Sequence, residues 1–122
     1  MTEYTNREAI ISALVDQGFD RSVIEIHDQA VPLSDGKRKA HIVIRKKDMK
    51  SYAWTDTGFE LMPDGKYRWH FDEYTMNKDW RGQHHQRYNY HHRVSKAKSL
   101  GFKVQSEDKQ PNGNIVLRLS RS

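Results

Sequence analysis

Two dipeptides constrain the fold of this chain more than any other feature: Asp64-Gly65 and Asn112-Gly113. Both residue types tolerate the positive φ angles of tight hairpin turns, so each dipeptide predicts a hairpin between two strands. The segment 66–72 after the first dipeptide alternates as a strand should, and its inward residues are aromatic: Tyr67, Trp69 and Phe71. The sheet is therefore expected to be antiparallel.

Two segments have the periodicity of helices. Asn6 is the expected cap of a helix over about 7–17, and Gly18 is its expected end. A second helix is predicted from about 79 to 99. The other expected strands run over 22–27, 40–46, 51–54, 58–62, 102–107 and 115–119. The first of them is expected to carry Ile24 and Ile26 on its inner face, and the second Ala40, Ile42 and Ile44.

Both predicted helices end at Gly-Phe and are followed by a strand, a turn containing glycine and a second strand. We predict one α+β domain over residues 1–122. Its antiparallel sheet has about six strands with two helices on one face, arranged as two helix–strand–strand units with an inserted hairpin.

Composition narrows the class of protein. The chain has no cysteine, which excludes disulfides, thiolate metal sites and cysteine nucleophiles. It has no apolar run long enough for a membrane span and no leader pattern, so we expect a cytoplasmic protein without a membrane partner. Positive charge is concentrated in two segments: 37–50 carries seven bases and one acid, and 80–122 carries nine bases and two acids. This asymmetry favours an anionic partner.

The segment 82–93, GQHHQRYNYHHR, contains four of the seven histidines. No two of them lie three or four residues apart, and a gap of seven residues is about 10 Å along a helix. Two histidine nitrogens on one zinc ion lie within roughly 3–4 Å of each other. The segment is therefore not a self-contained metal site, and we predict neither a metal nor a cofactor.

The same helix has three stripes. We expect Tyr90, Val94 and Ala97 to pack on the sheet, while the stripe of His84 and Tyr88 is partly covered at most. Tyr88 and Tyr90 are expected to be core or rim anchors. The third stripe, which is expected to face solvent, contains His85, Asn89, His92 and Lys96. Arg87 requires an acidic partner or a ligand anion.

Alternation of the strands predicts a polar, basic sheet face opposite the helices, displaying Glu25, His27, His41, Val43, Arg45, Arg68, His70, Lys103 and Arg118. Such a face suits phosphate contacts. The aromatic residues that a single-strand-binding sheet exposes are predicted to be inward here, which favours backbone contact or a small anion over base stacking. The candidate anion-binding residues are Arg45, Arg87, His91, His92, Arg118 and His41, with Lys37, Arg38 and Lys39 as mobile loop contacts.

Four segments resemble a known family: AHIVIRKK (40–47), DTGFELMPDGKY (56–67), QRYNYHHRV (86–94) and GFKVQSEDKQPNGNIVLRLSR (101–121). They are similar to the hypothetical chloroplast reading frame thirty-five family of cyanobacteria and red-algal plastids, which has bacterial and phage relatives. The resemblance implies a compact α+β domain and transfers no activity. Some relatives are encoded near ATPases of the AAA type, which implies an accessory role.

Three functions follow as hypotheses. The first is a non-enzymatic binding protein for an anionic partner, either nucleic acid or a phosphorylated small molecule. The second is an adaptor of a protein partner, such as an AAA-type ATPase, that uses the aromatic and acidic segment 51–80. The third is a metal-independent phosphodiesterase with one histidine as base and another as acid, and Arg45 or Arg118 on the phosphate. The candidate histidines are His41, His70, His91 and His92. A solvated sheet face, or one buried in a homodimer, is the alternative without a ligand.

Overall fold

The computed structural model describes residues 4–111 and 115–121. Its first helix, α1 (Arg7–Asp16), begins where the side chain of Asn6 accepts a hydrogen bond from the Ala9 N–H at 3.1 Å. It ends before Gly18, whose φ of +100° suits glycine and turns the chain toward the sheet. The predicted cap and the predicted end of this helix are both confirmed.

The main sheet is antiparallel and has four strands in chain order, β1 (Glu25–Pro32), β2 (Lys39–Ile44), β3 (Thr57–Leu61) and β4 (Tyr67–His70). The turn at Asp64-Gly65 joins β3 to β4, as predicted, and a turn at Asp35-Gly36 lies between β1 and β2. The predicted turn at Asn112-Gly113 lies outside the described residues.

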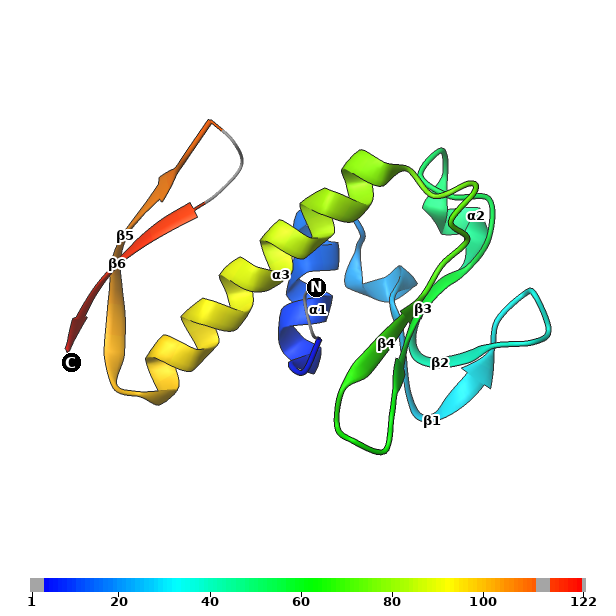
Figure 1. Cartoon of the computed structure of the whole chain (residues 1–122), viewed down its shortest axis with the longest axis horizontal. Helices are drawn as coiled ribbons and strands as arrows, with labels where there is room; N and C mark the ends of the chain where they lie inside the picture. The colour runs from blue at the N-terminus through cyan, green and yellow to red at the C-terminus, as the bar shows by residue number, and fades with distance from the viewer. Residues whose placement is uncertain (1–3, 112–114, 122) are drawn as a thin grey trace.

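The prediction of one sheet with about six strands is wrong. Helix α3 (Lys78–Ser99) leads to a separate two-stranded sheet of β5 (Phe102–Lys109) and β6 (Ile115–Arg121). The length of α3 explains the separation, because its 22 residues span about 33 Å. Figure 1 shows this hairpin at the far end of α3, away from the four-stranded sheet.

Helices α1 and α3 pack together against the main sheet (Figure 1), and the buried side chains between them form the core. Ile24 and Ile42 belong to it, but Ile26 is 45% exposed, so the predicted inward pair on the first strand is wrong. The register of β1 against β2 shifts after Ile26, and the simple alternation fails there. The predicted strand over 51–54 is also absent, since these residues form a turn and bends after α2 (Lys46–Met49).

A second, smaller cluster of apolar side chains lies apart from the core. Leu33 and Val31, from the end of β1 and the turn after it, cover Val43 and Ala40. Val43, predicted to lie on the displayed sheet face, is therefore fully buried, and Ala40 is buried with it instead of with Ile42. The β1–β2 connection thus removes part of the predicted binding face from solvent.

Within the described residues, no helix combines the length and the apolar character that a membrane crossing needs.

Candidate functional site

Arg45 is held by acids of the protein itself. Its Nε donates to Glu25 at 2.8 Å, and one terminal nitrogen donates to Asp56 at 3.1 Å and to the Pro32 carbonyl at 3.0 Å. Asp56 is buried and also accepts from the backbone N–H of Lys46. The hydrogen bond from Arg45 lowers the pKa of Glu25 below its ordinary value. Arg45 thus connects β1, β2 and the segment before β3, and most of its donors are occupied.

Arg87 and His91 share one carboxylate. Arg87 donates to Asp16 from Nε at 2.9 Å and from a terminal nitrogen at 2.5 Å, and Nε2 of His91 lies 2.6 Å from the same oxygen. Burial alone would raise the pKa of Asp16, but the hydrogen bonds from His91 and Arg87 lower it. Of the two partners predicted for Arg87, an acid or a ligand anion, the structure provides the acid.

The four histidines of the segment 82–93 have four different surroundings. His84 is fully buried and lies 2.8 Å from the Gln17 side-chain oxygen. His85 hydrogen-bonds the Tyr4 hydroxyl, and His92 stacks on Tyr88 with ring centroids 5.6 Å apart. His91 pairs with Asp16. In the described part of the chain, no group of three or more metal-ligating side chains lies together.

The stripe assignment for α3 requires correction. The side chains that face the main sheet are Trp80 and His84, which contact the rings of Trp69 and Phe59. The Tyr88 hydroxyl accepts instead from the N–H groups of Thr5 and Asn6, just before α1. Tyr90 instead donates to Glu107 of β5. Tyr88 and Tyr90 are both buried, which confirms them as anchors. The expectation that His84 and Tyr88 are at most partly covered is wrong.

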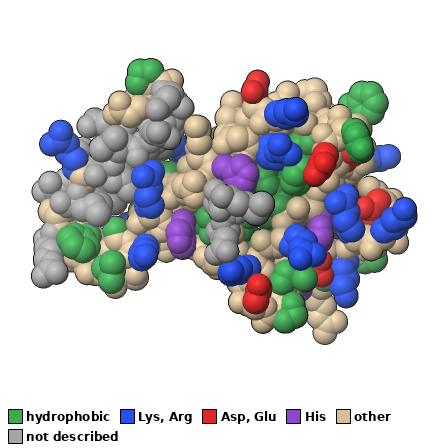
Figure 2. All heavy atoms as spheres, in the orientation of Figure 1, with side chains coloured by type: hydrophobic (Ala, Val, Ile, Leu, Met, Phe, Trp, Pro, Cys, Tyr) green, Lys and Arg blue, Asp and Glu red, His purple; other side chains and the backbone are tan. Residues whose placement is uncertain are grey.

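The remaining candidates lie on other elements. Arg38 donates to Asp35 at 2.8 Å and to the Phe71 carbonyl, His41 accepts from the Leu61 N–H at 3.0 Å, and Lys37, Lys39 and Arg118 are exposed. Arg118 belongs to the separate β5–β6 sheet. Figure 2 shows basic side chains spread over the drawn face instead of gathered in one patch. The structure therefore does not unite the nine predicted residues in one site, and their contact with an anion stays a prediction.

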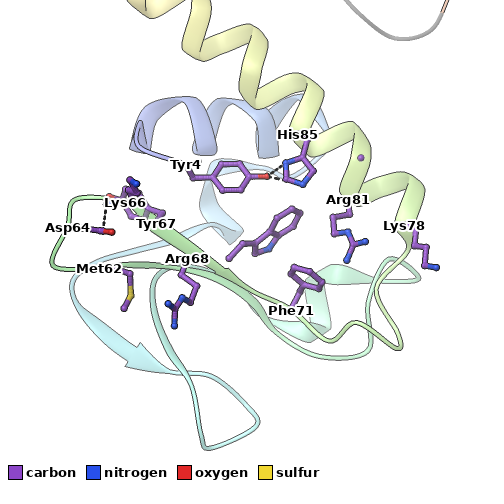
Figure 3. A pocket seen from close by; sticks show the side chains of 12 residues that line it. Tyr4, Met62, Asp64, Lys66, Tyr67, Arg68, Phe71, Lys78, Arg81 and His85 are labelled. Carbon is purple, nitrogen blue, oxygen red and sulfur yellow. Dashed lines mark hydrogen bonds between the residues drawn. The ribbon is translucent and has the colours of Figure 1, made fainter. Parts of the chain in front are cut away.

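A groove between β4 and the first half of α3 is the strongest candidate site. It has a volume of about 630 Å³, within the range of small-molecule sites. Its aromatic lining comes from Tyr4 before α1, from β4 and from the residue after β4, and its cations come from both sides (Figure 3). The residues that define the β4–α3 groove here are Tyr67, Trp69, Phe71, Arg68, Lys78 and Arg81.

Several of these side chains are fixed by their neighbours. The Trp69 ring stacks on Phe59 at 5.1 Å, and its indole N–H donates to the Thr57 hydroxyl at 2.7 Å. The guanidinium of Arg81 lies over the Phe71 ring, 4.8 Å from its centroid. Figure 3 shows Arg81 between α3 and Phe71. This contact holds a planar cation at the groove without using its N–H donors.

The electrostatics of the groove favour an anion. Across residues 4–111 and 115–121, none of Arg68, Lys78 and Arg81 has an ion pair with a carboxylate. One acid, Asp64, lines the groove. Burial, with the nearby Arg81 charge second, lowers the pKa of His85, which favours its neutral form. Arg68, Lys78 and Arg81 therefore line the groove with a single carboxylate among the lining residues.

A family model described as "Protein of unknown function (DUF1257)" matches residues 13–118. The chain belongs to this family. The match corrects the resemblance to the hypothetical chloroplast reading frame thirty-five family, which is not the family that the model identifies. No curated protein and no solved structure matches the chain.

Sequence reasoning did not select the groove in this DUF1257 chain. Trp69 and Phe71 were predicted to be inward, and they do pack on the core, but both remain only partly buried. Arg68 was assigned to the displayed sheet face, whereas Arg81 and Lys78 were not selected. One signal was present: Gly82 lies inside the helix predicted over about 79–99, where glycine is unfavourable.

Proposed function

We propose that this protein is a non-enzymatic binding protein that holds an anionic partner, nucleic acid or a phosphorylated small molecule, in the β4–α3 groove. The observation that carries the proposal is the position of Arg81, which stacks on Phe71 and has no carboxylate partner in the described part of the chain. Arg45 and Arg87 fit this role less well because they are engaged by Glu25 and Asp16.

Arg81 is suited to bind phosphate. Its guanidinium presents several N–H donors in a rigid plane, a geometry that matches phosphate oxygens. Stacking on Phe71 restricts the side chain before a ligand arrives, which reduces the entropy lost on binding. The protein therefore offers a preorganised cation at one side of the groove.

Lys78 adds to the same site. It lies three residues before Arg81 in the first turn of α3, so both side chains leave neighbouring positions of one helix face. The N-terminal end of a helix also carries a partial positive charge that attracts anions. Together these features favour a ligand that places negative charge close to the start of α3.

The proposal is tested by titrating the protein with a fluorescein-labelled single-stranded oligonucleotide and, by calorimetry, with inorganic tripolyphosphate. Replacing Lys78 and Arg81 with alanine should weaken binding about tenfold or more, because charge-assisted hydrogen bonds contribute about 1.5–3 kcal/mol each. For the oligonucleotide, the slope of log K against log salt should become shallower by about 1.4, since each phosphate contact contributes about 0.7.

A charge-matched control uses Lys47→Ala with Lys98→Ala, two exposed lysines outside the groove lining. This variant should retain most of the affinity. Equal losses in the two double variants would show that binding follows net charge, not the groove. Absence of binding to both ligands at low salt would contradict the proposed function.

A second candidate function is that of an adaptor for a protein partner, and one observation favours it. Two large aromatic side chains in the segment 51–80 are highly exposed, Trp54 at 76% and Tyr74 at 97%. The two loops that carry them are joined by a hydrogen bond from the Asn77 N–H to the Tyr52 carbonyl at 2.8 Å. Exposed aromatic side chains are enriched in protein interfaces. The suggestion of an AAA-type ATPase rested on the corrected resemblance and is not retained.

Native mass spectrometry and purification at high salt test the adaptor. A stoichiometric partner that is retained by the protein and lost in the Trp54→Ser, Tyr74→Ser variant is the expected result. Dimerisation that depends on the same two residues would identify a homodimer contact instead. The phosphodiesterase is not favoured, because His91 is engaged by Asp16 and His92 by Tyr88.

A further inference from the structure

We propose that the anion recognised by the β4–α3 groove is part of a nucleotide unit, with an aromatic base on the groove's aromatic lining and a phosphate at Arg81 and Lys78. This inference rests on the proposed function and deepens it by naming the ligand class. Free nucleotides and single-stranded nucleic acid share this chemistry, and the test below separates them.

The aromatic lining calls for more than an inorganic anion. Tyr67, Trp69 and Phe71 all reach the groove, and each is only partly buried. A purely ionic ligand would leave these rings in water, whereas a nucleobase offers a flat π surface to them. Stacking of a base on an aromatic side chain stabilises nucleic-acid complexes and tolerates any base.

The arrangement of the cation and the ring supports one ligand that contacts both. Arg81 stands 4.8 Å from the centre of the Phe71 ring, and Phe71 contacts Trp69 edge to face at 5.2 Å. A phosphate bound to Arg81 therefore lies next to aromatic surface, as the phosphate and base of one nucleotide do. The volume of about 630 Å³ is sufficient for such a unit.

Gly82 is an independent observation. It lines the groove in the interior of α3, and a Cβ atom built at this position meets no atom within 4 Å. Packing within the protein therefore does not explain the glycine, although glycine is less favourable in a helix than alanine. An absent side chain leaves the helix wall bare, so that a flat ligand can approach the α3 backbone closely.

Three probes test the ligand class by titration at one ionic strength: adenosine triphosphate, a decathymidylate single strand and inorganic tripolyphosphate. A ligand with a base should bind at least about tenfold more tightly than tripolyphosphate, the gain expected from stacking. Tighter binding of adenosine triphosphate would identify a free nucleotide as the source. Tighter binding of the decathymidylate alone would identify a single strand.

Gly82→Leu and its control Gly82→Ala connect the preference to the groove. The leucine should weaken binding of the preferred probe by about tenfold or more because it occupies the wall, while the alanine should change it less than about threefold. Circular dichroism should show both variants folded. If Gly82→Leu unfolds the protein, Phe71→Leu supplies the second test, and the preference over tripolyphosphate should then fall.

Three outcomes would overturn the inference. Tripolyphosphate binding as tightly as the base-containing probes would refute the nucleotide while the anion-binding function stands. An undiminished nucleotide preference in Gly82→Leu would refute the groove as its location. If none of the three probes binds, the proposed function and this inference are both wrong.

Discussion

His84 is a titratable side chain held in its neutral form. Gln17 donates through its amide nitrogen to the Trp80 carbonyl at 3.0 Å, so its oxygen accepts from Nδ1–H of His84. The other ring nitrogen is buried without a partner in the described part of the chain. Burial, with a smaller contribution from His85, lowers the pKa of His84 from 6.5 to about 3.

This lowered pKa predicts a pH dependence of stability. Because the unfolded chain binds a proton near pH 6.5 and the folded one only near pH 3, the stabilisation is complete above 6.5 and declines as pH falls. The free energy of unfolding should decrease by roughly 1.4 kcal/mol per pH unit between these values from His84 alone. Urea titrations from pH 4 to 7 measure this change in the free energy of unfolding. His84→Phe should flatten the dependence, and an unchanged slope would contradict the assignment.

Lys50 has the backbone conformation of a glycine. It follows α2 with φ of 54° and ψ of −126°, and it is the one non-glycine residue with positive φ in the described chain. Such strain costs a non-glycine residue roughly 1–3 kcal/mol, and a glycine at this position would avoid it. Part of that gain in stability is lost because glycine has greater conformational freedom in the unfolded chain. Lys50→Gly should therefore raise the free energy of unfolding by about 1 kcal/mol.

Lys47→Gly, inside α2, is the control and should lower the free energy of unfolding by about the same amount. Thermal or urea unfolding of both variants measures the difference.

At the scale of elements, Asp16 couples the two main helices. It is the last residue of α1, where a negative charge is unfavourable for the helix dipole, and Arg87 and His91 of α3 compensate it. Asp16→Asn should cost about 1–2 kcal/mol of stability at pH 7, allowing for partial exposure. The effect should vanish at low pH. Because the folded state lowers the pKa of Asp16, the ionised carboxylate stabilises the fold fully above its ordinary pKa of 3.8, and this stabilisation is lost as the pH falls through the pKa of the folded state.

The control for Asp16→Asn is Glu8→Gln, which removes another carboxylate of α1. Glu8 contacts Arg21 at 3.8 Å, and both side chains are mostly exposed, so the loss should be only a few tenths of a kcal/mol. Unfolding curves of the two variants at pH 7 and pH 3 provide the comparison. Equal losses at pH 7 would mean that Asp16 does not couple α1 to α3.

The existence of most elements was predictable because local chemistry determines it. Asn6 and Gly18 delimit α1, and Asp64-Gly65 determines the β3–β4 hairpin. The buried face of α3 was not predictable by a single stripe, since the helix uses two faces along its length. Its first half packs on the main sheet through Trp80 and His84, and further along Tyr90 contacts β5. No local pattern shows where one partner ends and the next begins.

The groove could not be predicted for a related reason. Arg81 and Phe71 are ten positions apart and meet only because α3 crosses the end of β4. Conversely, Arg45 and Arg87 were selected by residue type, and the acids that neutralise them, Glu25 and Asp16, come from distant positions. Charge in a sequence predicts the kind of partner, whereas tertiary contacts decide which charges remain available.

At the scale of the whole molecule, the four-stranded sheet and the β5–β6 hairpin are supported unequally. The main sheet shares a buried core with α1 and α3, while the hairpin forms its own two-stranded sheet and contacts the end of α3. Tyr90 connects α3 to the hairpin through Glu107, and burial together with this carboxylate raises the pKa of Tyr90 to about 12. Isolated two-stranded hairpins are marginally stable in water.

Amide hydrogen exchange should therefore separate two units. Amides of β2 and β3 should exchange only through global unfolding, because both strands have a neighbour on either side and a buried face. Amides of β5 and β6 should exchange at least about tenfold faster through local opening. Tyr90→Phe removes the hydroxyl that bonds to Glu107, so it should accelerate exchange in the hairpin and leave β2 unchanged. Uniform protection across both sheets would instead show that the chain unfolds as one cooperative unit, with the hairpin stabilised by more than its contact with α3.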